Sequence, residues 1–209
     1  MAIEVTTRRG QTARMNLPSL TLRTSILAVL LLAPGGAAGA DPVAEAARDG
    51  QHDFDFFVGT WKQHNRRLKN PLTGSTTWYE FDSRTVVRPV WGGKANMDEF
   101  EADSPSGRIQ GLTLRLYDPK ARQWSIYWAN SAAASPMGVP TVGGFDASGR
   151  GEFFDQEMFQ GRSILVRFVW SDIKADSYRW EQAFSLDGGK TWETNWVTDG
   201  TRARGGEEP

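Results

Sequence analysis

The sequence of 209 residues contains no cysteine and only two histidines, His52 and His64. The absence of cysteine excludes disulfide bonds, thiolate nucleophiles, cysteine-ligated metals and lipid attachment at a cysteine. The sequence also lacks the Gly-x-Ser-x-Gly, His-Glu-x-x-His and phosphate-loop motifs of common enzyme classes. We therefore find no catalytic motif, and we predict no metal site.

Long apolar runs are absent as well. The apolar run near the N-terminus covers only residues 26–33, whereas a membrane-spanning helix needs about 20 residues. It follows a basic segment and precedes small residues that end at Ala40, which is the arrangement of a secretory signal peptide. We expect residues 1–40 to be this signal, with cleavage between Ala40 and Asp41 and export to the periplasm or beyond. A membrane anchor is the alternative that the short run disfavours.

Residues 41–209 carry 20 of the 24 basic residues and 24 of the 25 acidic ones, for a net charge of −4. Bulk charge of this sign predicts no binding to nucleic acid or to an anionic membrane. The length predicts a single domain over 41–200, followed by a flexible tail over 201–209. All nine tryptophans and all eleven phenylalanines lie beyond residue 40, so the domain has a large aromatic surface to bury.

Alternation with a period of two dominates the domain, and turn residues interrupt it often. Leu112, Leu114 and Leu116 share one strand face, and Thr113 and Arg115 share the other. Each strand thus has an apolar and a polar face, which is typical of a sheet packed on one side and solvated on the other. The predicted strands are 61–68, 76–90, 95–102, 109–117, 124–128, 139–145, 152–159, 164–170, 178–185 and 191–198.

We therefore predict an all-β fold: an antiparallel up-and-down barrel of about ten strands, which removes the exposed sheet edges. A sandwich is the alternative, because it satisfies the same alternation. A short helix over 42–49 and an aromatic turn or 3₁₀ segment over 52–58 are expected before the first strand.

Three short segments carry a family resemblance. Gly59-Thr60-Trp61 opens the first strand, about ten meandering strands follow, and the last hairpin is rich in aromatic residues. This pattern resembles the calycin superfamily, which includes lipocalins, fatty-acid-binding proteins and nitrobindin-like barrels. Through Phe54–Gly59, Tyr117-Asp118-Pro119 and Asp187–Trp192, the chain more closely resembles an uncharacterised bacterial family of exported calycin-like barrels. The resemblance implies a cavity of ligand size and no particular reaction.

The resemblance to nitrobindin-like barrels raises the question of haem binding. Nitrobindin-like barrels bind haem through a histidine near the end of the chain, whereas His52 and His64 both lie near the beginning of the domain. The chain departs from that pattern, so we expect neither haem nor any other cofactor.

Tryptophans on strand faces that we expect to point inward are the candidate ligand contacts. Two amides share faces with them and are suited to pair with an indole N–H or with a ligand. Simple core packing is the alternative, and the favoured one for most of the indoles. The candidates are Trp61, Trp128, Asn130, Trp180, Gln182, Trp192 and Trp196.

Two acidic clusters and one motif have structural interpretations that we favour over functional ones. Carboxylates at 98–103 and 152–157 are able to support acid–base chemistry or calcium binding, but solvated strand faces with edge-protecting charge are the usual explanation. Residues 185–192 match the Asp-box found in sialidases. A sialidase needs several boxes in a much longer chain, so a structural hairpin is expected.

Three functions remain open on the sequence. The leading hypothesis is an exported barrel that binds a small apolar or aromatic molecule in its interior. The second is a hydrolase or isomerase that uses residues at the barrel mouth, such as Glu99 or His64. The third is a cell-envelope interaction protein with a solid barrel.

Overall fold

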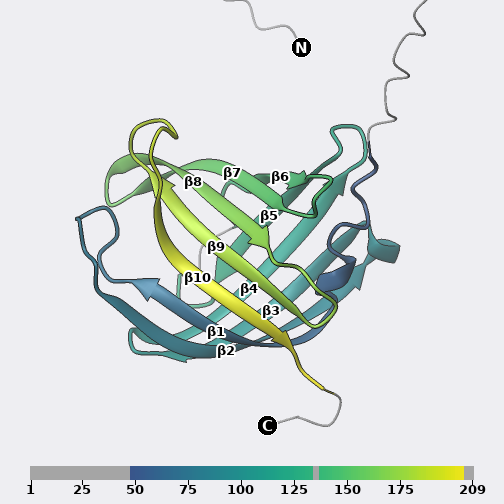
Figure 1. Ribbon diagram of the computed structural model, residues 1–209, viewed down its shortest axis with the longest axis horizontal. Helices are drawn as coiled ribbons and strands as arrows, with labels where there is room; N and C mark the ends of the chain where they lie inside the picture. Colours follow the sequence, from purple (N-terminus) through teal and green to yellow (C-terminus); the bar gives the residue numbers. More distant parts are fainter. Residues whose placement is uncertain (1–47, 134–136, 205–209) are drawn as a thin grey trace, which may run out of the picture. The chain divides into compact units, whose positions relative to one another are not determined.

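The computed structural model describes residues 48–133 and 137–204, in which ten antiparallel strands close into one barrel (Figure 1). Each strand pairs with its neighbours in sequence, and β1 pairs with β10, so the barrel has no free edge. The predicted barrel is confirmed and the sandwich is wrong. The strands are β1 (Gly59–Leu68), β2 (Trp78–Val90), β3 (Ala95–Ser104), β4 (Gly107–Asp118), β5 (Gln123–Asn130), β6 (Thr141–Phe145), β7 (Gly151–Phe159), β8 (Arg162–Ser171), β9 (Ser177–Ser185) and β10 (Glu193–Arg202).

Two short 3₁₀ segments complete the described elements, η1 (Asp55–Phe57) and η2 (Trp91–Gly93). The first confirms the aromatic segment predicted over 52–58. The predicted signal peptide, its cleavage site and residues 42–47 of the predicted helix lie outside the described residues, and residues 48 and 49 are not helical. β10 continues to Arg202, beyond the predicted strand end at 198, because Arg202 still pairs with Trp61 of β1.

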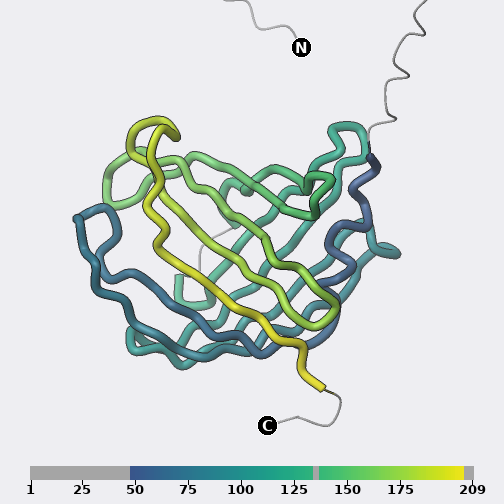
Figure 2. The backbone as a smooth tube through the Cα atoms, in the orientation of Figure 1, coloured from purple at the N-terminus to yellow at the C-terminus, as the bar shows by residue number. Residues whose placement is uncertain are grey.

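One end of the barrel is closed by an aromatic cluster, and we call it the plugged end. Residues 48–58 fold against this end before β1 begins (Figure 2). Phe54 and Phe57 are inserted among the inward-facing rings, where they pack against Trp61, Trp124 and other aromatic residues. The indole N–H of Trp61 donates to the carbonyl of Phe57 (2.7 Å), so the plug also satisfies a buried donor.

The strand β4 faces the opposite way from what its leucines suggest. Thr113 and Arg115 are buried inside the barrel, and Leu112, Leu114 and Leu116 are half-buried on the outside. Ile109 and Tyr117, which have the same parity as Arg115, are also buried. The prediction of one inward apolar face is therefore wrong for this strand, and a polar group enters the interior.

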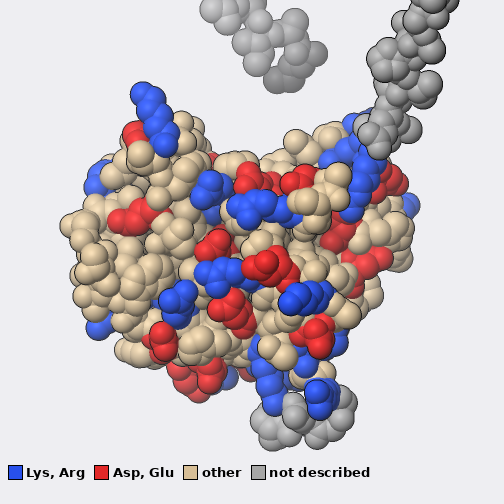
Figure 3. All heavy atoms as spheres, viewed as in Figure 1, with Lys and Arg blue, Asp and Glu red and all other residues tan. Residues whose placement is uncertain are grey.

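The outer surface carries charges of both signs. Acidic and basic side chains are interspersed on the face that β9 and β10 present (Figure 3). Arg179, for example, lies between Glu181 (3.1 Å) and Asp199 (2.9 Å). Pairs of this kind are worth little individually, but they keep a strand surface soluble. No helix among the described residues is long and apolar enough to cross a membrane.

Candidate binding cavity

A cavity of about 380 Å³ occupies the half of the barrel away from the plugged end. Phe57 and Trp170 of the aromatic plug form its floor, and Trp128, Val139 and Glu157 lie at its open end. Trp128 and Val139 are 39% and 71% exposed, so this end of the cavity reaches solvent. The volume lies in the range of about 300–1,000 Å³ that is usual for small-molecule sites.

Aromatic rings form one wall of the cavity. Trp180 packs edge-on against Trp196, with ring centroids 5.8 Å apart, and against Phe168 at 5.0 Å. Phe100 contacts both Trp128 (6.0 Å) and Trp196 (6.1 Å). These edge-to-face contacts fix the ring orientations, so the wall is formed before any ligand arrives.

Four of the seven candidate residues line this cavity: Trp128, Trp180, Gln182 and Trp196. Gly111 on β4 makes the position of Trp128 possible, because a Cβ atom there would lie 1.8 Å from the indole ring.

The other three candidates lie elsewhere. Trp61 belongs to the packed plug, where it is fully buried. Asn130 ends β5, and its Oδ1 accepts a hydrogen bond from the amide of Ala132 (2.9 Å). Trp192 precedes β10 on the outer side, with its ring beneath the guanidinium of Arg167 at 4.6 Å. The period of two does not hold at Trp192, because this residue belongs to the turn.

A fully paired polar network covers the wall formed by β1, β2 and β9. Gln63 is its centre: the side-chain carbonyl accepts from Ser83 (2.8 Å) and Thr85 (2.7 Å), and the amide donates to Tyr178 (2.6 Å). Asn65 continues it by donating to Ser83 (2.8 Å). Because these groups satisfy one another, the network needs no ligand to be stable.

The same network holds the aromatic wall in place. Asn65 accepts hydrogen bonds from the indole of Trp196 (3.1 Å) and from the hydroxyl of Thr198 (2.7 Å). The indole is thus fixed by a buried amide from another strand, which sequence reasoning did not identify. The sequence did contain a signal for Asn65: it is a polar residue at an even spacing from Trp61 on β1, and therefore at an inward position.

A buried ion pair crosses β3 and β4 beside the floor of the cavity. Arg115 donates to Asp98 (2.5 Å) and to Asn96 (3.1 Å), and the side chains of Arg115 and Asp98 are only 6% and 3% exposed. The guanidinium also lies 4.9 Å from the ring centroid of Phe57. Arg115 and Asp98 neutralise each other, as burial of two charges requires.

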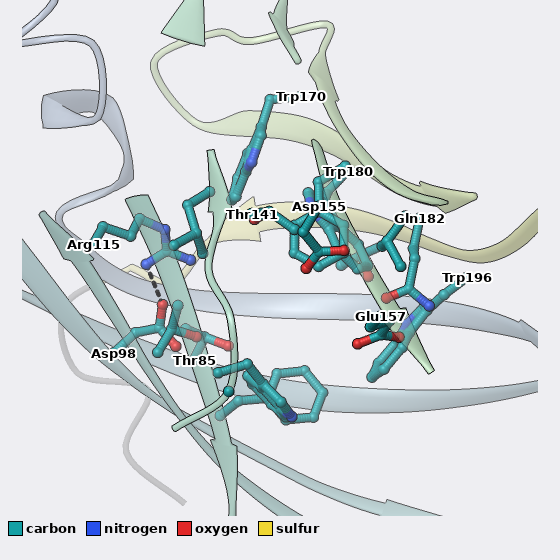
Figure 4. Close-up of a pocket in the computed structure, with 18 of the residues that line it drawn as sticks. Thr85, Asp98, Arg115, Thr141, Asp155, Glu157, Trp170, Trp180, Gln182 and Trp196 are labelled. Carbon is teal, nitrogen blue, oxygen red and sulfur yellow. Dashed lines mark hydrogen bonds and ion pairs between the residues drawn. The ribbon is translucent and has the colours of Figure 1, made fainter. Parts of the chain in front are cut away.

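Two carboxylates of β7, Asp155 and Glu157, also face inward (Figure 4). Asp155 and Glu157 line the cavity, together with Phe159 of the same parity, while Phe154 and Met158 are exposed outside. The prediction that these acids form a solvated outer face is therefore wrong. Phe153, two positions before Asp155, is buried with the same parity, but the adjacent Phe154 suggests the opposite orientation, so the sequence carried no signal for the inward face of this strand.

Burial changes the acidity of these two groups. Loss of hydration and, as the smaller cause, the nearby Glu157 carboxylate together raise the pKa of Asp155 to about 7. Burial also raises the pKa of Glu157. Asp155 is therefore partly protonated at neutral pH, unlike an ordinary surface carboxylate.

Four buried polar atoms around the cavity have no hydrogen-bond partner among the described residues. They are Oδ1 of Asp155, Oγ1 of Thr141, Nε1 of Trp170 and Nε of Arg115. Most buried polar groups are paired, because an unpaired one costs about 1–3 kcal/mol. These unpaired atoms lie around the cavity, whereas the Gln63 network is fully paired, so they are suited to polar contacts with a ligand.

The residues suggested for catalysis at the barrel mouth do not lie there. Glu99 is on the outside of β3, where it pairs with Arg88 (2.6 Å). His64 is on the outside of β1, where Asp82 accepts a hydrogen bond from Nδ1 of its ring (2.9 Å) and raises the pKa of the imidazole. His52 lies near Asp55 (2.8 Å), and neither histidine lines the cavity. Within the described residues, no group of three metal-binding side chains is brought together.

The Asp-box is a structural hairpin, as predicted. Asp187 accepts hydrogen bonds from the backbone and the hydroxyl of Thr191 (2.9 and 2.7 Å), and these bonds lower the pKa of Asp187 to about 2. Gly188 and Gly189 supply the positive φ values of the turn (71° and 87°). All the polar atoms of this carboxylate are used in the turn, which leaves it no separate role.

Comparisons with known proteins support the fold. No family model matches the chain, and no curated protein matches it. The S-type phycobiliprotein lyase CPES from Guillardia theta is 14% identical with a TM-score of 0.53, and the match covers 76% of this chain and 94% of that one. Rv2717c from M. tuberculosis is 12% identical with a TM-score of 0.50, over 75% of this chain and 99% of that one. At these identities the similarity shows the β-barrel fold and nothing beyond it.

Proposed function

We propose that this protein is an exported barrel that binds a small apolar or aromatic molecule in its interior. The observation that carries the proposal is the cavity of about 380 Å³, which has an indole wall and several buried polar atoms without partners among the described residues. Apolar surface with a few polar groups that fix orientation is typical of a ligand site. Export rests on the charge, apolar length and cleavage-site pattern of residues 1–40. Membership of the uncharacterised family of exported calycin-like barrels is part of the same proposal.

The solid-barrel hypothesis is less well supported, because the described interior holds this open cavity. An enzyme has one observation in its favour. Asp155, with a pKa of about 7, is suited to proton transfer at neutral pH. Binding is nevertheless favoured, because no described hydroxyl group is hydrogen-bonded to Asp155 or Glu157 as a nucleophile would be.

Filling the cavity should abolish binding. We expect the neutral probe N-phenyl-1-naphthylamine to gain fluorescence on binding and to quench Trp180 and Trp196. Thr141→Phe places a ring in the cavity, at a position whose hydroxyl has no partner among the described residues. The affinity of this variant for the probe should therefore be at least tenfold lower than that of the original chain. Titration of probe fluorescence measures this effect, and a fatty acid and an isoprenoid serve as competitors.

Val142→Phe is the matched control, because Val142 is adjacent on β6 but has the opposite parity. Its affinity should stay within twofold of the original chain. Equal binding by Thr141→Phe and the original chain, or equal losses in both variants, would place the probe outside the barrel.

A further inference from the structure

The charges that line the cavity do not cancel. The lining contains the cations Arg67 and Arg115 and the acids Asp98, Asp155 and Glu157. Arg115 is paired with Asp98, and the guanidinium of Arg67 lies over the Trp196 ring at 4.6 Å. Among the described residues, neither Asp155 nor Glu157 forms an ion pair, although both carboxylates are partly withdrawn from water.

We propose that the ligand is an organic cation, with an ammonium or amidinium group held by Asp155 and Glu157 and an aromatic or apolar body against Trp180 and Trp196. This inference rests on the proposed function and names the ligand class. An indole face also attracts a cation, so the aromatic wall favours the same ligand.

Neutral and anionic ligands fit this geometry less well. An anion would face two carboxylates that form no ion pair with a described residue, and Arg67, a cation of the same lining, is stacked on Trp196 instead. A neutral hydroxyl group satisfies one acceptor atom but leaves the charge of the pair uncompensated. An ammonium group supplies three donors and a positive charge at once, which is what two adjacent carboxylates require.

Two further side chains point to a ligand independently of the acids. Thr141 and Trp170 are 2% and 3% exposed, and Oγ1 of the first and Nε1 of the second have no partner among the described residues. The indole N–H of Trp170 donates only, and it lies at the floor of the cavity. The ligand should therefore carry a hydrogen-bond acceptor at the end that enters first, and its cationic group nearer the opening.

Three probes of one shape separate the possibilities. They are 2-(1-naphthyl)ethylamine, which is protonated at pH 8, the neutral 2-(1-naphthyl)ethanol, and the anion 1-naphthylacetate. Equilibrium dialysis with chromatographic detection measures each Kd on the full chain. We expect the amine to bind at least tenfold more tightly than the alcohol, and the acetate to bind most weakly.

Neutralising the acids should weaken the amine selectively. Asp155→Asn should raise the Kd of the amine at least tenfold and that of the alcohol by less than threefold. Glu157→Gln should raise the Kd of the amine about threefold, because Glu157 is nearer to solvent. Glu152→Gln is the control: Glu152 lies on β7 with the opposite parity and pairs with Arg150 outside the barrel (3.1 Å), so no change is expected.

The affinity for the amine should also depend on pH. Only ionised Asp155 attracts the cation, and this carboxyl is protonated below its pKa of about 7. The Kd should therefore fall about tenfold between pH 6 and pH 8, and most of this change should be lost in Asp155→Asn. The other charged groups that face the cavity are Arg67 and the buried pair of Arg115 and Asp98; the arginines stay cationic, and burial raises the pKa of Tyr178. Glu157 adds to the change in Kd in the same direction.

Thermal unfolding separates weak binding from misfolding. Because the pKa of Asp155 in the folded state is raised above its ordinary value of 3.8, stability falls as pH rises from about 4 to 7 and stays lower above that range. Asp155→Asn removes this loss, so at pH 8 it should unfold at or above the temperature of the original chain. At pH 4 the two should agree.

The outcomes of these experiments test the cationic ligand separately from the proposed binding function. If N-phenyl-1-naphthylamine binds but the amine has no advantage over the alcohol, or keeps its affinity in Asp155→Asn, the ligand is not a cation and the binding function stands. If the original chain binds none of the four probes, the binding function itself is wrong.

Discussion

Replacing Arg115 by methionine is expected to lower the free energy of unfolding by about 3–5 kcal/mol. The reason is the isolated charge that remains: Asp98 is 2% exposed, and Arg115 is its ion-pair partner in the structure. Chemical denaturation at pH 7 measures this loss. The slope of the unfolding free energy against denaturant concentration should be the same in both proteins, which would show that the variant unfolds between the same folded and unfolded states as the original chain.

The double variant Arg115→Met with Asp98→Leu tests the cause of that loss. Removing both charges leaves no uncompensated ion, and replacing a buried pair by apolar groups is often neutral or stabilising. The double variant should therefore recover most of the stability that Arg115→Met loses. A double variant as unstable as the single one, or a single loss below about 1 kcal/mol, would contradict a buried ion pair at this place.

Truncation of Trp124 to alanine is expected to cost about 3–5 kcal/mol, because it leaves a cavity in the plugged end. The indole is 1% exposed, packs edge-on against Phe54 (5.1 Å), and donates to the carbonyl of Gly50 (2.9 Å). The variant thus loses packing and leaves a backbone acceptor unpaired. Thermal and denaturant unfolding monitored by circular dichroism both report this change.

Trp91→Ala provides the matched comparison, because Trp91 in η2 is 72% exposed. Its removal should alter the free energy of unfolding by less than about 0.5 kcal/mol. Similar losses in Trp91→Ala and Trp124→Ala would mean that the plug does not stabilise the barrel.

The strands of this barrel could be located from sequence because local signals mark them. Alternation of side chains fixes which residues share a face, and turn residues such as those of the Asp-box at 185–192 mark the hairpins. Both patterns extend over only a few residues, so they can be recognised without knowing which strands pair.

The inward face of a strand depends on partners far away in the chain, and this is where sequence reasoning was wrong. On β4 the three leucines favoured one orientation, but the interior takes Arg115 because Asp98 on β3 has the register to pair with it. On β7 the same inversion brings Asp155 into the cavity. The period-two pattern is the same whichever face of a strand points inward, so the pattern alone could not predict the polar side of the site.

A crystal structure of the chain with 2-(1-naphthyl)ethylamine at pH 8 tests the interior site most directly. We expect density for the naphthyl rings against Trp180 and Trp196, with the amine nitrogen within about 3.2 Å of the Asp155 carboxylate. Density confined to a second pocket around Asn70 and Pro105, or to the outer surface with an empty interior, would contradict a binding function for the cavity.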